Sequence, residues 1–198
     1  QEGQGAFSKE RIARMAYLRN QYLEEIRHHY GDYEYTMIID FDLQGPWSTD
    51  GIAHTFGSDD WDMVSSFGIT TFPGTYGLIY AFYDTLAYVE ANKPVLRLTQ
   101  KTTTYNFLKL NCSAFDKLCK GDPLIPVKSS FGGMALYRTK ALCSAKYEEG
   151  RCEHISLHLR MAQNGYNRLY LNPNQLLLSG HQGPRNVASL FFSSTQRA

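Results

Sequence analysis

The sequence predicts an α/β domain in which helices pack in layers on a sheet. A helical pattern from residue 9 to about 29 precedes a strand over 35–43, a short helix over 47–56 and a buried strand over 61–69. This alternation of helices and strands is typical of layered α/β domains. The 198 residues, 43% of them hydrophobic, fit one globular domain, which we place at residues 1–198.

The first helix is predicted from apolar residues that recur at spacings of three and four, from Ile12 to Ile26. Ser8 is expected to cap its start, and Gly31 to end it. Arg19 lies on or beside the apolar stripe, where an arginine either extends to solvent or binds a ligand. Arg19 is therefore of interest as a binding residue, together with the other polar positions Arg11 and Asn20.

The sequence patterns that predict the remaining elements are weaker. Residues 76–91 are aromatic and apolar with a helical rhythm, and residues 92–124 are expected to run over the surface. A strand over 134–137 follows Gly132 and Gly133, and a helix is predicted over 153–163. A strand over 167–171 is expected to stop at residues 172–174, with a possible further strand over 175–178.

The strand over 35–43 contains Asp40 and Asp42, and the rest of the chain is organised around this pair. Side chains two apart on a strand share a face, so the two carboxylates are expected to converge. Carboxylates held close together repel unless a cation lies near them, and oxygen ligands suit hard divalent ions. This D-x-D pattern therefore predicts a metal site, although the pattern is short and two solvated loop carboxylates are the alternative.

Composition limits the possible partners. A net charge of +1 gives no electrostatic argument for nucleic acid. No apolar run is long enough for a transmembrane helix, so a soluble domain is expected, in the cytoplasm or in the Golgi lumen. Four cysteines allow three disulfide pairings without favouring one.

Four segments in this order resemble the GT-A glycosyltransferases, which use nucleotide sugars. They are Leu18-Arg19-Asn20 on a helix, a strand ending in Asp40-Phe41-Asp42, the glycine pair before a strand, and a helix that begins Glu153-His154 with Arg160 further along. The resemblance implies a GT-A-like, Rossmann-like mixed sheet flanked by helices. It also implies transfer of a sugar from a nucleoside-diphosphate sugar to a hydroxyl group of a glycan, protein or lipid acceptor.

The resemblance assigns roles to the donor-binding residues. Asp40 and Asp42 would hold Mn²⁺ or Mg²⁺ against the donor diphosphate, and His181 is a candidate further ligand. Arg19, Arg11 and Asn20 would face the nucleotide or its phosphates, where guanidinium groups suit paired oxygens. Gly132 and Gly133 would leave room for the sugar or the acceptor.

The resemblance also implies a catalytic base at the start of the last helix. Glu153 occupies the first acidic position of the family's motif, but His154 stands where inverting members have an aspartate. Either residue could accept the proton of the acceptor hydroxyl. Inversion is favoured and retention stays open. The family's first nucleotide-binding strand has no counterpart before residue 8, so we expect either that this strand is missing from the chain or that the nucleotide pocket is built differently.

Two other functions compete with the transferase. A phosphatase of the haloacid dehalogenase type would use Asp40 as its nucleophile, with Ser65 or Ser66 in its second motif. It would also need a later acidic pair at a strand end, and Asp59-Asp60 instead precedes its strand. A non-catalytic sugar-binding module would use the abundant aromatic residues without needing a metal.

Overall fold

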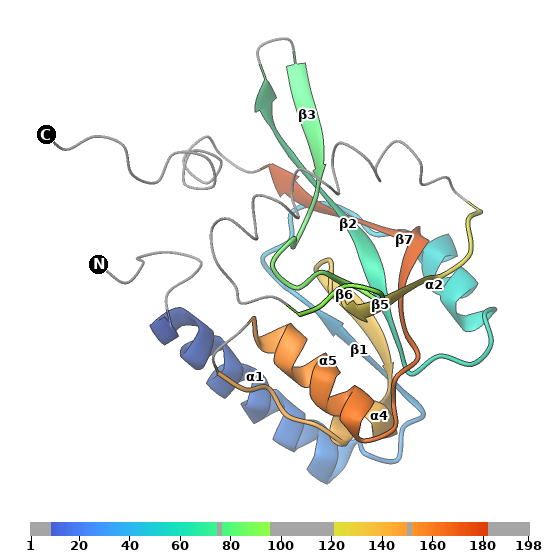
Figure 1. Cartoon of the computed structure of the whole chain (residues 1–198). Coiled ribbons are helices and arrows are strands. Elements are labelled where there is room, and N and C mark those ends of the chain that lie inside the picture. Colours follow the sequence, from blue (N-terminus) through green and yellow to red (C-terminus); the bar gives the residue numbers. More distant parts are fainter. Residues whose placement is uncertain (1–8, 75–76, 96–120, 150–151, 182–198) are drawn as a thin grey trace, which may run out of the picture.

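The computed structural model describes residues 9–74, 77–95, 121–149 and 152–181, which form a mixed, open seven-stranded sheet flanked by helices (Figure 1). The strands are β1 (Tyr35–Ile39), β2 (Met63–Gly74), β3 (Gly77–Phe82), β4 (Val89–Glu90), β5 (Ile125–Ser129), β6 (Met134–Arg138) and β7 (Leu169–His181). The helices are α1 (Lys9–His29), α2 (Thr49–Phe56), α4 (Thr139–Cys143) and α5 (Glu153–Gln163).

The sheet has the strand order β1-β6-β2-β7-β5-β4, and β3 pairs with β2 outside this path. Only β2 and β7 run parallel, while the other pairs among the described strands are antiparallel. β1 therefore lies at one edge of the sheet, with β6 as its neighbour. The predicted α/β class with a mixed sheet is confirmed.

Alternation along the strands divides the core between the two faces of the sheet. Met63 of β2 and Tyr137 of β6 belong to the large cluster that includes residues of α1, α4 and α5. Their neighbours Val64 and Leu136 point to the opposite face and pack in a smaller cluster with Ile52 of α2. Figure 1 shows the same division, with α1 and α5 side by side and α2 next to β7.

Several predicted elements are confirmed. The first helix spans Lys9–His29, and the last spans Glu153–Gln163. α2 begins at Thr49, because the side chain of Ser48 caps it by accepting a hydrogen bond from the Gly51 N–H at 2.9 Å. Residue 8, the proposed cap of the first helix, lies outside the described residues, as do residues 96–120 of the expected surface excursion.

The helical prediction over residues 76–91 is wrong. This part of the chain forms β3, a turn that contains Asp84, and β4. Almost every residue in the run is apolar or aromatic, so the helical spacing was not distinctive, and pairing of β3 with β2 decides the structure.

The predicted break at residues 172–174 is also wrong. β7 continues through them, and its register with β2 shifts there, because Ser66 pairs with Asn172 while the next residue, Phe67, pairs with Leu176. Asn172 and Asn174 are held inside the strand by side-chain hydrogen bonds, including Asn172 Nδ2 to Thr55 Oγ1 at 2.8 Å. Polar residues that resemble a turn in the sequence are thus satisfied within the sheet.

The state of two cysteines and the character of the helices can be compared with the expectations about disulfides and membrane helices. Cys143 and Cys152 are free, while the other two cysteines lie outside the described residues. None of the helices in the described ranges combines the length and apolar character needed to cross a bilayer.

Candidate functional site

A cavity of about 290 Å³ lies where α1, the turn after β1, the turn after β3 and the start of α5 meet. Its polar lining comes from residues far apart in the sequence. The residues that line it are Arg11, Ile12, Met15, Arg19, Asp40, Phe41, Asp42, Tyr83, Asp84, Leu86, Cys152, Glu153 and His154.

Both carboxylates of the D-x-D pattern line this cavity. β1 ends at Ile39, so Asp40 and Asp42 lie on the following turn rather than on the strand itself. The Asp40 N–H donates to the carbonyl of Gly133 at 2.9 Å, which fixes the start of this turn against β6. The side chains reach one cavity because of this turn, and not because of the alternation expected for a strand.

Arg19 is buried and joins two of the acids. Its Nη2 lies 3.1 Å from Asp40 Oδ1 and its Nε lies 3.1 Å from Glu153 Oε1. The guanidinium also lies 5.4 Å from the ring centroid of Phe131, within the range of a cation–π contact. The position of Arg19 beside the apolar stripe is therefore explained by a buried ion-pair network.

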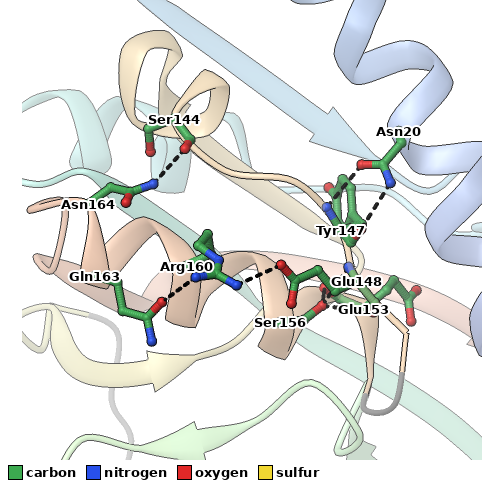
Figure 2. A network of polar contacts seen from close by, with 9 residues as sticks. All are labelled: Asn20, Ser144, Tyr147, Glu148, Glu153, Ser156, Arg160, Gln163 and Asn164. Carbon is green, nitrogen blue, oxygen red and sulfur yellow. Dashed lines mark hydrogen bonds and ion pairs between the residues drawn. The ribbon is translucent and has the colours of Figure 1, made fainter.

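The turn before α5 holds the start of the helix, and with it Glu153, in place (Figure 2). Ser156 Oγ accepts from the Glu148 N–H at 3.0 Å and lies 2.7 Å from the carbonyl oxygen of Glu153. Arg160 Nη2 donates to Glu148 Oε1 at 2.9 Å from the outer side of the helix. These contacts fix the first turn of α5 against the segment before it.

Asn20, predicted to bind the donor, forms hydrogen bonds to the backbone of Tyr147. Its Nδ2 donates to the carbonyl of Tyr147 at 2.9 Å, and its Oδ1 accepts from the N–H of Tyr147 at 3.0 Å (Figure 2). Both ends of the amide thus hold the backbone of a buried tyrosine. Asn20 is not among the described residues that line the cavity, and its contact with a donor stays a prediction.

His154 and His158 lie one turn apart on α5 but differ in their partners. The ring nitrogens of His158 lie 2.9 Å from Ser129 Oγ and 3.0 Å from Tyr137 Oη. The side chain of His154 lines the cavity and is 2% exposed, and neither of its ring nitrogens has a hydrogen-bond partner in the described part of the chain. Burial, Arg19 and His158 hold the pKa of His154 well below its usual range, so the imidazole is neutral.

Asp84 is the cavity residue that the sequence analysis missed. It lies in the turn after β3, in the left-handed conformation with φ of 63°, and its carboxylate accepts a hydrogen bond from the Gly132 N–H. Burial, Asp40 and Glu153 together raise the pKa of Asp84 to about 8. A signal existed, because Asp84 is the only charged residue between Asp62 and Glu90.

Backbone packing explains the need for glycine at positions 132 and 133. A Cβ atom on Gly132 would lie 2.1 Å from the carbonyl oxygen of Ser66, and Gly132 and Gly133 have positive φ angles of 65° and 84°. Neither glycine is among the described residues that line the cavity. Their predicted contact with a donor or an acceptor stays untested.

The charges of the cavity are unbalanced. Three carboxylates, on Asp40, Asp42 and Glu153, face two arginines, Arg11 and Arg19, while Asp84, with its pKa of about 8, is protonated at neutral pH. Burial raises the pKa of Asp40, with Arg19 opposing the shift and Asp42 and Glu153 adding to it. The donor set is made of oxygen atoms and carries excess negative charge, which fits a hard divalent cation.

The remaining ligands of such a cation are not defined. Among the described residues, no three His, Cys, Asp or Glu side chains are already arranged to hold a metal ion. The backbone of His181 ends β7, but its side chain lies outside the described part of the structure. Asp40 and Asp42 would thus hold a cation together with oxygens of the substrate or of water.

Comparison with known proteins assigns the chain to no group. No family model matches the sequence, and no curated protein matches it. The functional argument therefore depends on the residues that line the cavity.

Proposed function

We propose that this chain is a metal-dependent glycosyltransferase with a GT-A-like fold. It would move a sugar from a nucleoside-diphosphate sugar to a hydroxyl group of a glycan, protein or lipid acceptor. The observation that carries the proposal is that Arg19, Asp40 and Glu153, from three separate motifs, form one buried ion-pair network beside a cavity.

The excess of carboxylates in the cavity supports the cofactor. Asp40 and Asp42 would hold Mn²⁺ or Mg²⁺, and Arg11 lines the same cavity, where it would face the phosphates. When bound, the cation stabilises the negative charge of the departing nucleoside diphosphate as a Lewis acid. Arg19 keeps Asp40 in position for this task through its ion pair.

Glu153 is the proposed proton acceptor. The acceptor oxygen forms a bond to the anomeric carbon while the bond from that carbon to the diphosphate oxygen breaks, and the hydroxyl proton passes to the Glu153 carboxylate. One oxygen of Glu153 is held by Arg19, which orients the carboxylate. His154 is less suited to this role, because the lowered pKa makes its imidazole a weak base.

Calorimetry with UDP and with GDP, each with and without Mn²⁺, tests the proposal. Wild-type protein is expected to bind a nucleotide only with the metal, and Asp40→Ala or Asp42→Ala is expected to abolish this binding. Asp59→Ala is the control, because Asp59 is exposed and does not line the cavity. Unchanged binding in both cavity variants would refute the metal site.

The phosphatase alternative has less support. Ser65 and Ser66 are fully buried in β2, where Ser65 Oγ donates to the carbonyl of Tyr170 and Ser66 Oγ accepts from Gln175 Nε2. Neither serine lines the cavity beside Asp40. Trapping of a phosphate analogue on the Asp40 carboxylate would favour the phosphatase, and sugar binding without nucleotide binding would favour a sugar-binding module.

A further inference from the structure

A second hollow, of about 780 Å³, lies between α1 and β1. Every residue of β1 lines it, although neighbouring residues of a strand point to opposite faces of the sheet. The hollow therefore follows the edge of the strand rather than one of its faces. We call it the β1 groove, and its lining residues are Met15, Leu18, Arg19, Tyr22, Ile26, Tyr30, Tyr33 and residues 35–41.

The edge of β1 that faces this groove pairs with none of the described strands. β1 ends the strand order and has β6 as its neighbour. The Glu34 carbonyl and the Asp40 N–H both bond to the chain on the β6 side, and bonded residues alternate in an antiparallel pair. The N–H and C=O groups of Tyr35, Met37 and Ile39 consequently point away from β6, as a row of donors and acceptors along the groove.

The walls of the β1 groove are apolar, and its charges are paired. Arg19 and Asp40 are its charged residues, and they form an ion pair at 3.1 Å. Several of its large apolar side chains are exposed, by 45% to 97%, namely those of Leu18, Tyr30, Tyr33, Met37 and Phe41. A contiguous exposed apolar surface is typical of a site that binds another molecule, and here that molecule should be uncharged.

The row of backbone groups decides between an alkyl chain and a polypeptide. An alkyl chain would cover the apolar walls but leave the N–H and C=O groups of the β1 edge without partners, which costs free energy. An extended polypeptide supplies donors and acceptors at the spacing of a strand, and its alternate side chains reach the walls.

The position of α1 decides between one added strand and a second copy of the chain. α1 forms one wall of the groove, directly beside the β1 edge. A second copy that paired through its own β1 would bring a second α1 to the place that this wall occupies. The groove therefore suits a single strand without a helix of its own.

The β1 groove also adjoins the cavity of the candidate site. Met15, Arg19, Asp40 and Phe41 line both hollows. β1 leads directly into the turn that carries Asp40, so a segment paired along β1 runs toward the cavity. A partner bound in the groove would thus be held beside the candidate site.

We propose that the β1 groove binds an extended, uncharged segment of a protein partner, which pairs with β1 and adds a strand to the sheet. The inference goes beyond the proposed function and stands independently of it, because this binding requires neither a metal nor a nucleotide.

Amide hydrogen exchange measured by NMR would test the added strand, with a synthetic peptide that alternates threonine and valine between two terminal lysines. In the protein alone, the amides of Thr36 and Ile38 should be protected by their bonds to β6. Those of Tyr35, Met37 and Ile39 should exchange fast, and the peptide should protect them. The control peptides carry N-methyl groups on the valines or on the threonines, and at least one of them should not bind, because it lacks the donors that face β1.

Two pairs of variants test the strand edge and the apolar wall. Met37→Pro removes an N–H that points away from β6, so it should fold but bind the peptide roughly tenfold more weakly, whereas Met37→Val keeps this N–H and should bind normally. Leu18→Glu places a charge in the wall and should weaken binding as well. Tyr17→Glu is its control, because Tyr17 is exposed beside Leu18 but does not line the groove.

Each contrary result would identify a different occupant or none. Absence of protection by the peptide would overturn the proposal, as would binding at wild-type strength by folded Met37→Pro. Protection of Tyr35, Met37 and Ile39 before any peptide is added would overturn it too, in favour of a second copy if the protection rises with protein concentration and of the chain itself if it does not. Binding of dodecanol but not of the peptide would assign the groove to an alkyl chain.

Discussion

Arg19 connects the two halves of the candidate site at the level of single residues. It comes from α1, while its partners Asp40 and Glu153 come from the turn after β1 and from the start of α5. Two carboxylates that share one guanidinium are held at a fixed separation. Because all three side chains are at least half-buried, removal of the arginine would leave charges with no partner in a poorly solvated place.

Arg19→Met is therefore expected to lower the free energy of unfolding by about 3 kcal/mol or more, the usual loss when one partner of a buried ion pair is removed. Urea unfolding at pH 7 measures this change. Arg160→Met is the matched control, because Arg160 pairs with Glu148 at the surface, where such pairs contribute about 1 kcal/mol or less. Equal losses in the two variants would contradict the assignment of Arg19 to a buried network.

Glu153→Gln tests the proposed base. The amide keeps the shape of the side chain and can still accept from Arg19, but it cannot take up a proton. Donor binding should stay near the wild-type level, while the rate of transfer falls by roughly two to four orders of magnitude, as for other lost general bases. Full activity of the variant in a transfer assay would place the base elsewhere.

At the level of elements, residues 131–133, before β6, come close to both β2 and the turn after β3 that carries the cavity residue Asp84. A Cβ atom at position 132 would come within 2.1 Å of the Ser66 carbonyl oxygen, and the Gly132 N–H binds the Asp84 carboxylate. The turn before β6 and the turn after β3 thus depend on each other. This contact explains why a glycine, rather than another small residue, precedes β6.

Gly132→Ala should consequently destabilise the fold far more than Gly165→Ala. Both glycines have positive φ, of 65° and 95°, but nothing lies within 4 Å of a Cβ atom placed on Gly165. Gly165→Ala carries only the conformational cost, about 1 kcal/mol, whereas Gly132→Ala adds a clash with backbone. Thermal unfolding of both variants checks the difference, and similar melting temperatures would show that the turn can shift to make room.

At the level of the whole molecule, buried ionisable groups set the pH range of greatest stability. His154 and His158 have lowered pKa values, that of His158 being about 3 because of burial. Below about pH 6.5 the unfolded chain takes up protons at these positions that the folded chain does not, so stability falls as the pH is lowered. Asp84, with its pKa raised to about 8, acts in the opposite sense.

Asp84 keeps its proton in the folded state over a range, from about pH 4 to about 8, in which the unfolded chain loses it. Its contribution therefore makes stability fall as the pH rises through this range. Below pH 6.5 the effect of the two histidines on stability is larger than the opposite effect of Asp84. Above pH 6.5 the histidines no longer contribute, and only Asp84 changes stability with pH. A maximum of stability near pH 6.5 follows.

Urea unfolding at pH 5, 6.5 and 8 checks this expectation. Wild-type protein should be most stable at pH 6.5, with a loss toward pH 8 of up to about 1.4 kcal/mol per pH unit, the value for one proton. Asp84→Asn, which has no proton to lose, should reduce the loss toward pH 8 and increase the loss toward pH 5, where the histidines then act unopposed. A steady rise in wild-type stability from pH 5 to pH 8 would contradict the burial of Asp84.

Periodicity and turn chemistry predict part of this fold from the sequence. α1 and α5 were predictable because their apolar residues recur at helical spacing between clear ends, at Gly31 and at Asn164-Gly165. The same method failed for residues 76–91, where apolar residues occupy nearly every position, and at residues 172–174, where buried hydrogen bonds satisfy asparagines that normally mark turns. The residues of the candidate site differ in the same way. Arg19, Asp40 and Glu153 belong to sequence motifs and were predicted, whereas Asp84 belongs to no motif and was missed.

The sequence by itself determined the α/β class, the two long helices and the positions of the carboxylates, because these depend on spacing within one segment. Only the tertiary structure decided which of these carboxylates meet, since Arg19, Asp40, Asp84 and Glu153 come from four elements that long-range pairing brings together. It also decided which polar side chains are already satisfied. His158 and His154 look alike in the sequence, and only their surroundings give the ring nitrogens of His158 hydrogen-bond partners and leave those of His154 buried without a partner among the described residues.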